Sequence, residues 1–361
     1  MLTPAHRLST ARRLARLALA LGLLATVAPP GLAARTAAAA GRSDIYYIWR
    51  DGVRLADGVN PYGYDLPQEP EERATKHPSY LPLFYLAVAG AYELGVHDYT
   101  TWLALWRTVR IAAHVTIAVL LYHAGQRAGR PLLGLFGALF WSLNRWALYT
   151  VRSGGLDELA LLLLLLSLEC FGRRRRLAFL LLGTSLAIKH VGLLVAPLYL
   201  VWTWQRSDRA PRRERGTEAA WALLWIALVP LAVSLPFLWW DGSAFVSSIW
   251  SSAVRPAAGY GHVSAVGSLL GLHGGPARIP LLLLATLILL VAASYRAIGQ
   301  YTTTLLMFTV FTDFNTVLFP QYFAWVIPFI VLAAGEHVEV RTPRGAWRDD
   351  VTGVVSRARR G

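Results

Sequence analysis

Apolar segments rich in Leu, Ala and Val recur along this 361-residue chain, from its first residues almost to its C-terminus. Hydrophobic residues make up 55% of the sequence and charged residues only 16%, whereas a soluble domain carries about 25% charged residues. Inside a bilayer, a polypeptide backbone must satisfy its hydrogen bonds internally, which favours helices. The sequence therefore predicts an all-α integral membrane protein rather than a soluble domain with one anchor.

The positions of the basic residues set the predicted topology. The formal net charge is +14, and most Lys and Arg residues fall in segments that alternating topology places on one side. These are the N-terminus, Arg127 and Arg130, Arg173–Arg176, Arg206–Arg215, Arg296 and the tail from Arg341. Basic loops stay on the cytoplasmic side of a membrane. Topology thus accounts for the charge, and we expect a multi-pass protein of the plasma membrane with no nucleic-acid partner.

This pattern predicts about ten transmembrane helices with both termini inside. The expected spans are about 15–34, 103–124, 132–148, 157–171, 177–188, 190–204, 219–239, 279–295, 300–318 and 320–335. The segment 80–96 is short and interrupted by Pro and Gly, which favours a re-entrant or interfacial helix. A cleaved signal peptide is the alternative interpretation of the first span. We expect one membrane domain over residues 1–335 and a basic cytoplasmic tail over 336–361.

Two extracytoplasmic segments follow from this topology. The first loop, about 37–102, contains the long polar stretch Ser43–Pro82, and the second covers about 240–278. Ionisable and polar residues gather on this side: Asp44, Asp51, His77, Arg107, Arg110, Arg145, Arg152, Asp157, Glu158, Lys189, His190, His262, Asp313, Gln321 and Tyr322. The inner helix ends show only Arg runs without matching acids. Ionisable groups are costly at membrane depth, so the outer cluster predicts a functional site.

These residue types suit the transfer of a sugar from a lipid phosphate. An acid at the membrane surface can act as a general base towards a hydroxyl. Cations at outer helix ends can stabilise a phosphate as it leaves. Simpler roles stay open: Asp44 as a solvated loop acid, Arg107 and Arg110 snorkelling to headgroups, and Asp157 with Glu158 capping a helix. His262 lacks the spacing of a metal site, and the single Cys170 offers no disulfide.

Several short motifs resemble the GT-C superfamily of membrane glycosyltransferases. They are Asp44-Ile45-Tyr46-Tyr47 with Gly58-Val59-Asn60-Pro61-Tyr62, then Tyr80-Leu81-Pro82-Leu83, Arg152–Glu158, Ala187-Ile188-Lys189, and Phe314-Asn315 with Gln321–Trp325. Within the superfamily, the chain looks most like mannosyltransferases that use polyprenyl- or dolichyl-phosphate mannose. These include bacterial enzymes of phosphatidylinositol-mannoside synthesis and the enzyme that adds the first mannose to GPI precursors. The resemblance implies a GT-C-type helical bundle with a catalytic first extracytoplasmic loop.

The resemblance also implies roles for individual residues. Asp44 would be the catalytic base of an inverting single displacement, and Lys189, Arg107 and Arg110 would bind the donor phosphate. The sugar and acceptor would be bound by His77, Tyr80, Arg152, Asp157, Glu158, His190, His262, Gln321 and Tyr322. The GPI enzyme has Asp-x-Asp where this chain has Asp44-Ile45-Tyr46, so a second carboxylate and a divalent cation tied to it are missing from the pattern. No metal site or cofactor is predicted.

The expected partners are a polyprenyl-phosphate sugar as donor, a glycolipid or glycan as acceptor, and the bilayer. A lipid-linked sugar flippase or small-solute transporter is the alternative function. Such a protein needs polar groups through the bilayer midplane, often in symmetric broken helices. Here the polar groups gather on one side. A non-catalytic assembly subunit would explain the spans but not this one-sided cluster.

Overall fold

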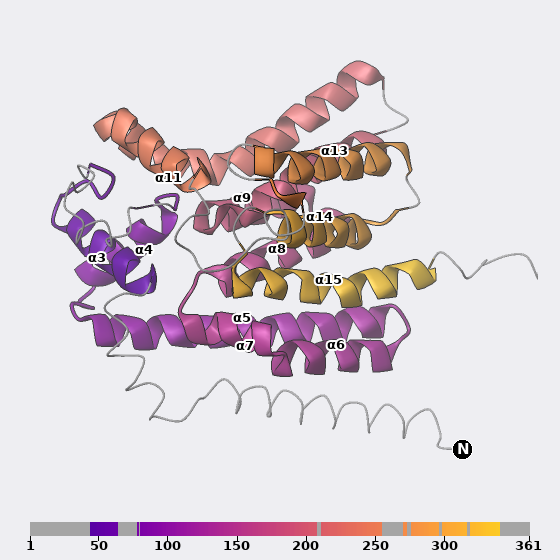
Figure 1. The fold of residues 1–361 in the computed structure, drawn as a ribbon, viewed down its shortest axis with the longest axis horizontal. Coiled ribbons are helices and arrows are strands. Elements are labelled where there is room, and N and C mark those ends of the chain that lie inside the picture. Colours follow the sequence, from indigo (N-terminus) through magenta and orange to yellow (C-terminus); the bar gives the residue numbers. More distant parts are fainter. Residues whose placement is uncertain are drawn as a thin grey trace, which may run out of the picture.

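The structure is a computed structural model, and the parts of the chain that it describes are helical throughout (Figure 1). It describes residues 44–63, 78, 80–207, 211–254, 270–272, 276–295, 298–315 and 318–339. The predicted all-α class is therefore confirmed for these residues. The expected first span at 15–34 and the tail from residue 340 lie outside them.

The helices follow one another with short connections. In chain order they are α3 (Asp44–Ala56), α4 (Leu83–Glu93), α5 (Tyr99–Arg127), α6 (Pro131–Leu143), α7 (Arg145–Ser153), α8 (Asp157–Phe171), α9 (Arg175–Ile188), η2 (His190–Leu194), α10 (Ala196–Arg206), α11 (Arg212–Val254), η3 (Pro276–Arg278), α13 (Ile279–Ser294), α14 (Gln300–Phe314) and α15 (Pro320–Glu339). Figure 1 shows α5, α15, α14 and α13 running alongside one another, with α3 and α4 beside one end of this bundle.

Three of the helices are long and apolar enough to cross a membrane: Tyr99–Arg127, Arg212–Trp250 and Pro276–Ser294. The third of these is barely covered by protein, since Leu282, Leu283 and Leu290 on α13 are all exposed. An apolar helix face left outside the protein core is suited to lipid. The structure thus has helices that suit a membrane, while the larger count of about ten spans stays a prediction.

The start of the polar stretch Ser43–Pro82, within the predicted first outer loop, is the helix α3. Charged residues are frequent in it, but Ile45 and Ile48 share one face with Gly52 and pack into the core. A Cβ atom on Gly52 would lie 2.4 Å from Val88 Cβ, so glycine is what allows α3 to rest against α4. The amphipathic spacing therefore outweighs the polar composition, and the predicted outer segment is helical over residues 44–56.

The span predicted at 132–148 is broken in two. Asn144 ends α6 in an extended conformation, and its Oδ1 accepts a hydrogen bond of 2.9 Å from Trp146 N at the start of α7. A side-chain oxygen that bonds the backbone in this way competes with a continuous helix. Helix α7 then ends at Gly154, whose φ of 86° lies in the left-handed region.

Helix α11 extends well beyond the predicted span 219–239. It reaches Val254, with non-helical dihedral angles at Asp241 alone. The Asp241 carboxylate accepts hydrogen bonds from Ser243 Oγ (2.9 Å) and Ala244 N (3.0 Å), which caps the second half. The second outer segment, predicted to begin at about residue 240, is therefore helical in its first part. His262 lies outside the described residues.

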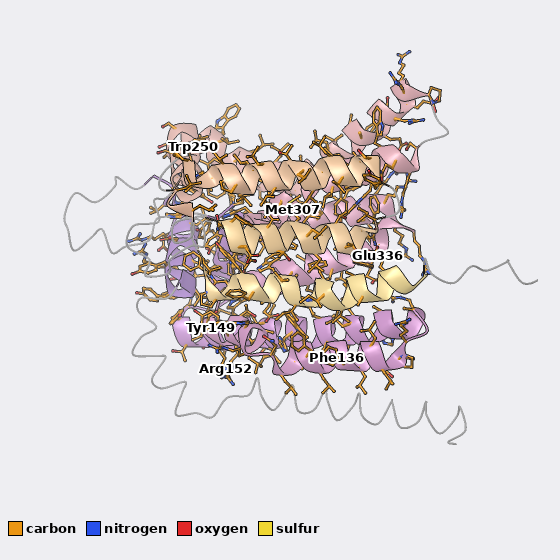
Figure 2. All side chains as sticks on the ribbon, turned by 45° about the vertical axis from the view of Figure 1, so that its right-hand side comes forward. Phe136, Tyr149, Arg152, Trp250, Met307 and Glu336 are labelled. Carbon is orange, nitrogen blue, oxygen red and sulfur yellow. The ribbon has the colours of Figure 1, made fainter. Side chains whose placement is uncertain are left out.

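The helices α8 and α9 form a hairpin, and their bounds lie close to the predicted spans 157–171 and 177–188. The hairpin gives the bundle two ends. Asp157 and Lys189 lie at one, which we call the Lys189 end. About 18 Å further along α8, at 1.5 Å per residue, the helix reaches Glu169 at the other, which we call the Arg127 end. In Figure 2, Arg152 and Glu336 lie towards these opposite ends.

Basic residues lie on three helix ends at the Arg127 end. Arg127 ends α5, Arg175 begins α9 and Arg206 ends α10. Acids accompany them, contrary to the expectation of Arg runs alone. Glu169 accepts a hydrogen bond of 2.5 Å from Arg127, and Glu336 lies in the last turns of α15.

Candidate active site

A buried ion pair joins the two helices of the α8–α9 hairpin. Lys189 Nζ donates to Asp157 Oδ1 at 2.6 Å, and Trp325 Nε1 donates to the same oxygen at 2.8 Å. Lys189 is 6% exposed and Asp157 3% exposed. The pair forms because α8 begins at Asp157 where α9 ends, so the two residues meet across the hairpin. The helix N-terminus also favours a carboxylate at Asp157.

Three less buried side chains surround this ion pair. His190 is exposed and interacts electrostatically with both Lys189 and Asp157. The Tyr80 ring lies 6.4 Å from the His190 ring, centroid to centroid. The Tyr322 hydroxyl is half-buried and close enough to Asp157 to interact with it electrostatically. Two tyrosines and a histidine therefore lie around the charged centre.

The backbone holds Tyr80 in this position. The Tyr62 hydroxyl donates to the Tyr80 carbonyl oxygen at 2.7 Å. The Tyr62 ring itself is buried against Phe237 and Phe245 of α11, with ring centroids 5.4 and 4.8 Å away. The segment after α3 is thereby anchored to α11 and forms one side of the site.

A second polar network lies behind the ion pair. His114 Nδ1 is 3.2 Å from Glu158 Oε1, and the Thr150 hydroxyl donates to the same carboxylate oxygen. Arg110 donates to the Val151 carbonyl oxygen and interacts electrostatically with Glu158. Arg110 and Glu158 are 3% and 1% exposed. The network connects α5, α7 and α8 within the packed interior.

This network contains polar atoms without a hydrogen-bond partner. They are Arg110 Nε, His114 Nε2 and Glu158 Oε2, all buried. An unmade hydrogen bond at a buried polar atom costs about 1–3 kcal/mol. Water molecules are common partners of such groups in protein interiors. At these three atoms, the protein interior at the Lys189 end has more hydrogen-bonding groups than protein partners for them.

Helix α3 meets the site at Gly154. The Ile45 side chain packs there, because a Cβ atom on Gly154 would lie 3.0 Å from Ile45 Cγ2 and 4.0 Å from Arg110. Trp106 Nε1 donates to the Gly154 carbonyl oxygen at 3.0 Å and fixes the turn. Asp44 directly precedes Ile45 and begins α3. The chain at Asp44 is therefore placed beside the turn that leads into Asp157 and Glu158; the Asp44 side chain lies outside the description.

The remaining predicted site residues occupy different positions. Arg107 is half-buried, Arg152 is exposed, and Gln321 is half-buried next to Tyr322. Arg110 is buried and interacts electrostatically with Glu158. Asp157 and Glu158 were expected to touch sugar or acceptor, and in the structure one oxygen of each carboxylate is bonded to protein groups. His77 and His262 are outside the described residues.

Three contributing residues were missed or given no role at the sequence level. His114 lies four residues after Arg110, so both share one helix face, and an ionisable residue within an apolar helix is itself a signal. Trp325 was quoted only as part of a motif, yet its indole N–H holds Asp157. Thr150 carried no sequence signal, because its bond to Glu158 depends on how α7 meets α8.

Within the described part of the chain, no three His, Cys, Asp or Glu side chains group closely enough to hold a metal ion. Comparison with known proteins finds no matching family, no matching curated protein and no matching solved structure. The resemblance to GT-C glycosyltransferases therefore stays a prediction from the motifs.

Proposed function

We propose that the Lys189 end is the active site of a membrane glycosyltransferase. It would transfer a sugar, mannose by the resemblance, from a polyprenyl-phosphate donor to a hydroxyl of a glycolipid or glycan. The observation that carries the proposal is the buried Lys189–Asp157 pair with His190, Tyr80 and Tyr322 beside it. A lysine amine has several hydrogen-bond donor positions, and Asp157 Oδ1 accepts at one of them, so a phosphate oxygen can accept at another.

The charge distribution supports an extracytoplasmic site. The described arginine clusters lie at the Arg127 end, and basic segments favour the cytoplasmic side. The Lys189 end would then face outwards in a plasma-membrane protein of about ten spans. A polyprenyl chain would lie in the bilayer with its phosphate at the level of Lys189.

The proposed reaction is an inverting single displacement. The Asp44 carboxylate takes the proton of the acceptor hydroxyl, and the acceptor oxygen attacks the anomeric carbon. The bond from that carbon to the phosphate oxygen breaks, and the lipid phosphate leaves with the electron pair. Lys189 and Arg107 stabilise the leaving phosphate, while Asp157 and Trp325 position Lys189.

The other residues would shape the pocket. Tyr80, His190, Gln321 and Tyr322 surround the ion pair and are suited to sugar hydroxyls and ring faces. Arg110 and Glu158 would position this end of the bundle from behind. Arg152, exposed at the end of α7, would meet donor or acceptor at the rim.

Transfer assays on the full-length protein test the base assignment. Membranes carrying Asp44→Asn are supplied with radiolabelled polyprenyl-phosphate mannose, and labelled glycolipid is measured. General-base catalysis contributes about 10²–10⁴-fold, so we expect a loss of that size. Asp57→Asn is the matched control, because Asp57 is exposed just after the same helix and should leave turnover unchanged. Wild-type turnover by Asp44→Asn would remove Asp44 from the mechanism.

The same membranes distinguish the alternative function. A flippase moves labelled lipid between leaflets and forms no new glycosidic bond. Lipid movement without a labelled product, in the wild-type protein, would reject the transferase and support the transporter.

A further inference from the structure

A second recess lies at the Arg127 end, away from the candidate active site. Its volume is about 280 Å³, and it opens between the ends of α5, α8, α14 and α15. Its polar wall consists of Arg127, Glu169, Gln300, Tyr301 and Glu336. None of these residues has a role in the proposed transfer.

The polar wall is held in place by hydrogen bonds among these helices. Glu169 accepts from Arg127 at 2.5 Å and from the Tyr301 hydroxyl at 2.9 Å. Glu336 accepts from Thr302 N and Thr302 Oγ1, each at 3.0 Å, and from Tyr301 N at 3.3 Å, at the start of α14. An ionised carboxylate has about four acceptor positions. Both acids therefore keep capacity for a further donor.

Small residues create the space. Ala124, Gly125 and Ala128 of α5 and Gly335 of α15 line the recess. A Cβ atom on Gly125 would lie 2.3 Å from Gly134 Cα, so α5 and α6 touch backbone to backbone here. The recess exists because these helix ends meet without large side chains between them.

The charges of the wall select the ligand. One arginine and two glutamates give it a local charge of opposite sign to the chain's net +14. An anion alone would meet two carboxylates, and the described residues supply no three-ligand group for a metal ion. A zwitterion matches the charges of this wall. Its ammonium group would lie beside Glu169 and Glu336, and its phosphate would lie beside Arg127, whose side chain is 52% exposed.

The recess is also continuous with apolar surface. Leu133, Val331 and Leu332 form its apolar wall. On α6, Leu132 and Phe136 next to that wall are 75% and 58% exposed; Figure 2 shows Phe136 on α6, away from the bundle centre. A volume of this size is at or below the lower limit of small-molecule sites. It suits a headgroup whose acyl chains lie along α6.

We propose that this recess binds the headgroup of a zwitterionic phospholipid with a primary amine, of the ethanolamine type, in the cytoplasmic leaflet. The assignment of leaflet rests on the membrane orientation of the proposed function. A primary ammonium donates hydrogen bonds to Glu169 and Glu336, which a quaternary choline group lacks. Bound lipid would bridge α5, α8 and α15 at the Arg127 end.

Native mass spectrometry of the full-length protein in detergent tests this site. The protein is titrated with phosphatidylethanolamine, phosphatidylcholine or phosphatidylglycerol of identical acyl chains, and with free glycerophosphoethanolamine. One charge-assisted hydrogen bond corresponds to roughly tenfold in affinity. We expect the ethanolamine lipid to bind about tenfold more tightly than the choline lipid, with the free headgroup weakest.

Glu169→Gln should abolish that preference, and Glu336→Gln should do the same if α14 keeps its place. Glu218→Gln is the control, since Glu218 forms an exposed ion pair of 3.7 Å with Arg175 at the same end. Equal binding of all lipids, preference for the glycerol lipid, equally tight free headgroup, or an unchanged preference in Glu169→Gln would each overturn the proposal. Asp44→Asn, which tests the transferase, should keep the lipid preference, so the two proposals fail separately.

Discussion

Removing one partner of the Lys189–Asp157 pair should destabilise the protein strongly. At 2.6 Å, two unit charges attract by about 6 kcal/mol with an effective dielectric constant near 20. Most of that attraction offsets the desolvation of both ions. If only one partner is removed, the other stays buried and uncompensated, so we expect Lys189→Met and Asp157→Asn each to cost about 3–5 kcal/mol.

The double variant Lys189→Met/Asp157→Asn distinguishes this reasoning from simple loss of packing. With no charge left uncompensated, it should be more stable than either single variant, giving a coupling energy of about 1–3 kcal/mol. Equilibrium unfolding in mixed micelles measures all three free energies. The exposed pair Arg175–Glu218 is the control, and Arg175→Met should cost less than about 1 kcal/mol. Additive costs in the double variant, or single variants as stable as wild type, would refute the argument.

Gly52→Ala should lower the free energy of unfolding by about 1–3 kcal/mol, because the new methyl group clashes with Val88. Gly90→Ala on α4 has open space around it and should be neutral or stabilising. Thermal unfolding in detergent compares the two variants. Gly154→Ala should lower the free energy of unfolding by about 1–2 kcal/mol, because the backbone there is left-handed. It should also reduce sugar transfer by displacing α3. Unchanged transfer would show that the position of α3 does not affect the site. Burial raises the pKa of the Asp51 carboxyl, and this effect is larger than the lowering caused by Arg50 and Arg54. The contribution of Asp51 to stability is therefore present below the unfolded pKa of 3.8 and lost as pH rises through the folded pKa. Asp51→Asn should flatten this part of the pH–stability profile above about pH 4, and an unaltered profile would contradict that.

Helix bounds were predictable from the sequence where glycines mark the helix ends clearly. Gly154-Gly155 precedes α8 and Gly172 follows it, so its bounds were predicted correctly. The breaks inside apolar runs were not predictable by hydropathy. Asn144 divides one run through a local side-chain bond, and α11 continues past Asp241 because that carboxylate caps a second helix.

Helix α3 shows that hydropathy alone does not identify a polar helix. Its composition is polar, so hydropathy places it only outside the spans, although Ile45, Ile48 and Gly52 follow a helical spacing. The helix is stable because that narrow face packs against α4. Whether the segment forms a helix therefore depends on α4, which the local sequence does not include.

The candidate site was predictable as a set of residues but not as contacts. Lys189 stood out because a buried lysine needs a partner. That partner, Asp157, lies on the neighbouring helix and had been expected to touch substrate. Glu158 and Arg110 likewise proved to face His114, a pairing that depends on how α5 packs against α8 rather than on any motif.

The hydrogen bonds at Asp157 Oδ1 have a consequence for how the protein is made. Lys189 is 32 residues away in sequence and Trp325 is 168 residues away. Because a chain emerges from the ribosome N-terminal end first, the ion pair can form as soon as the α8–α9 hairpin is inserted. The Trp325 indole can donate only after α15 has been inserted. Between these two events the hairpin is assembled but Asp157 lacks one donor, so the insertion of α15 completes the hydrogen bonds at Asp157 Oδ1.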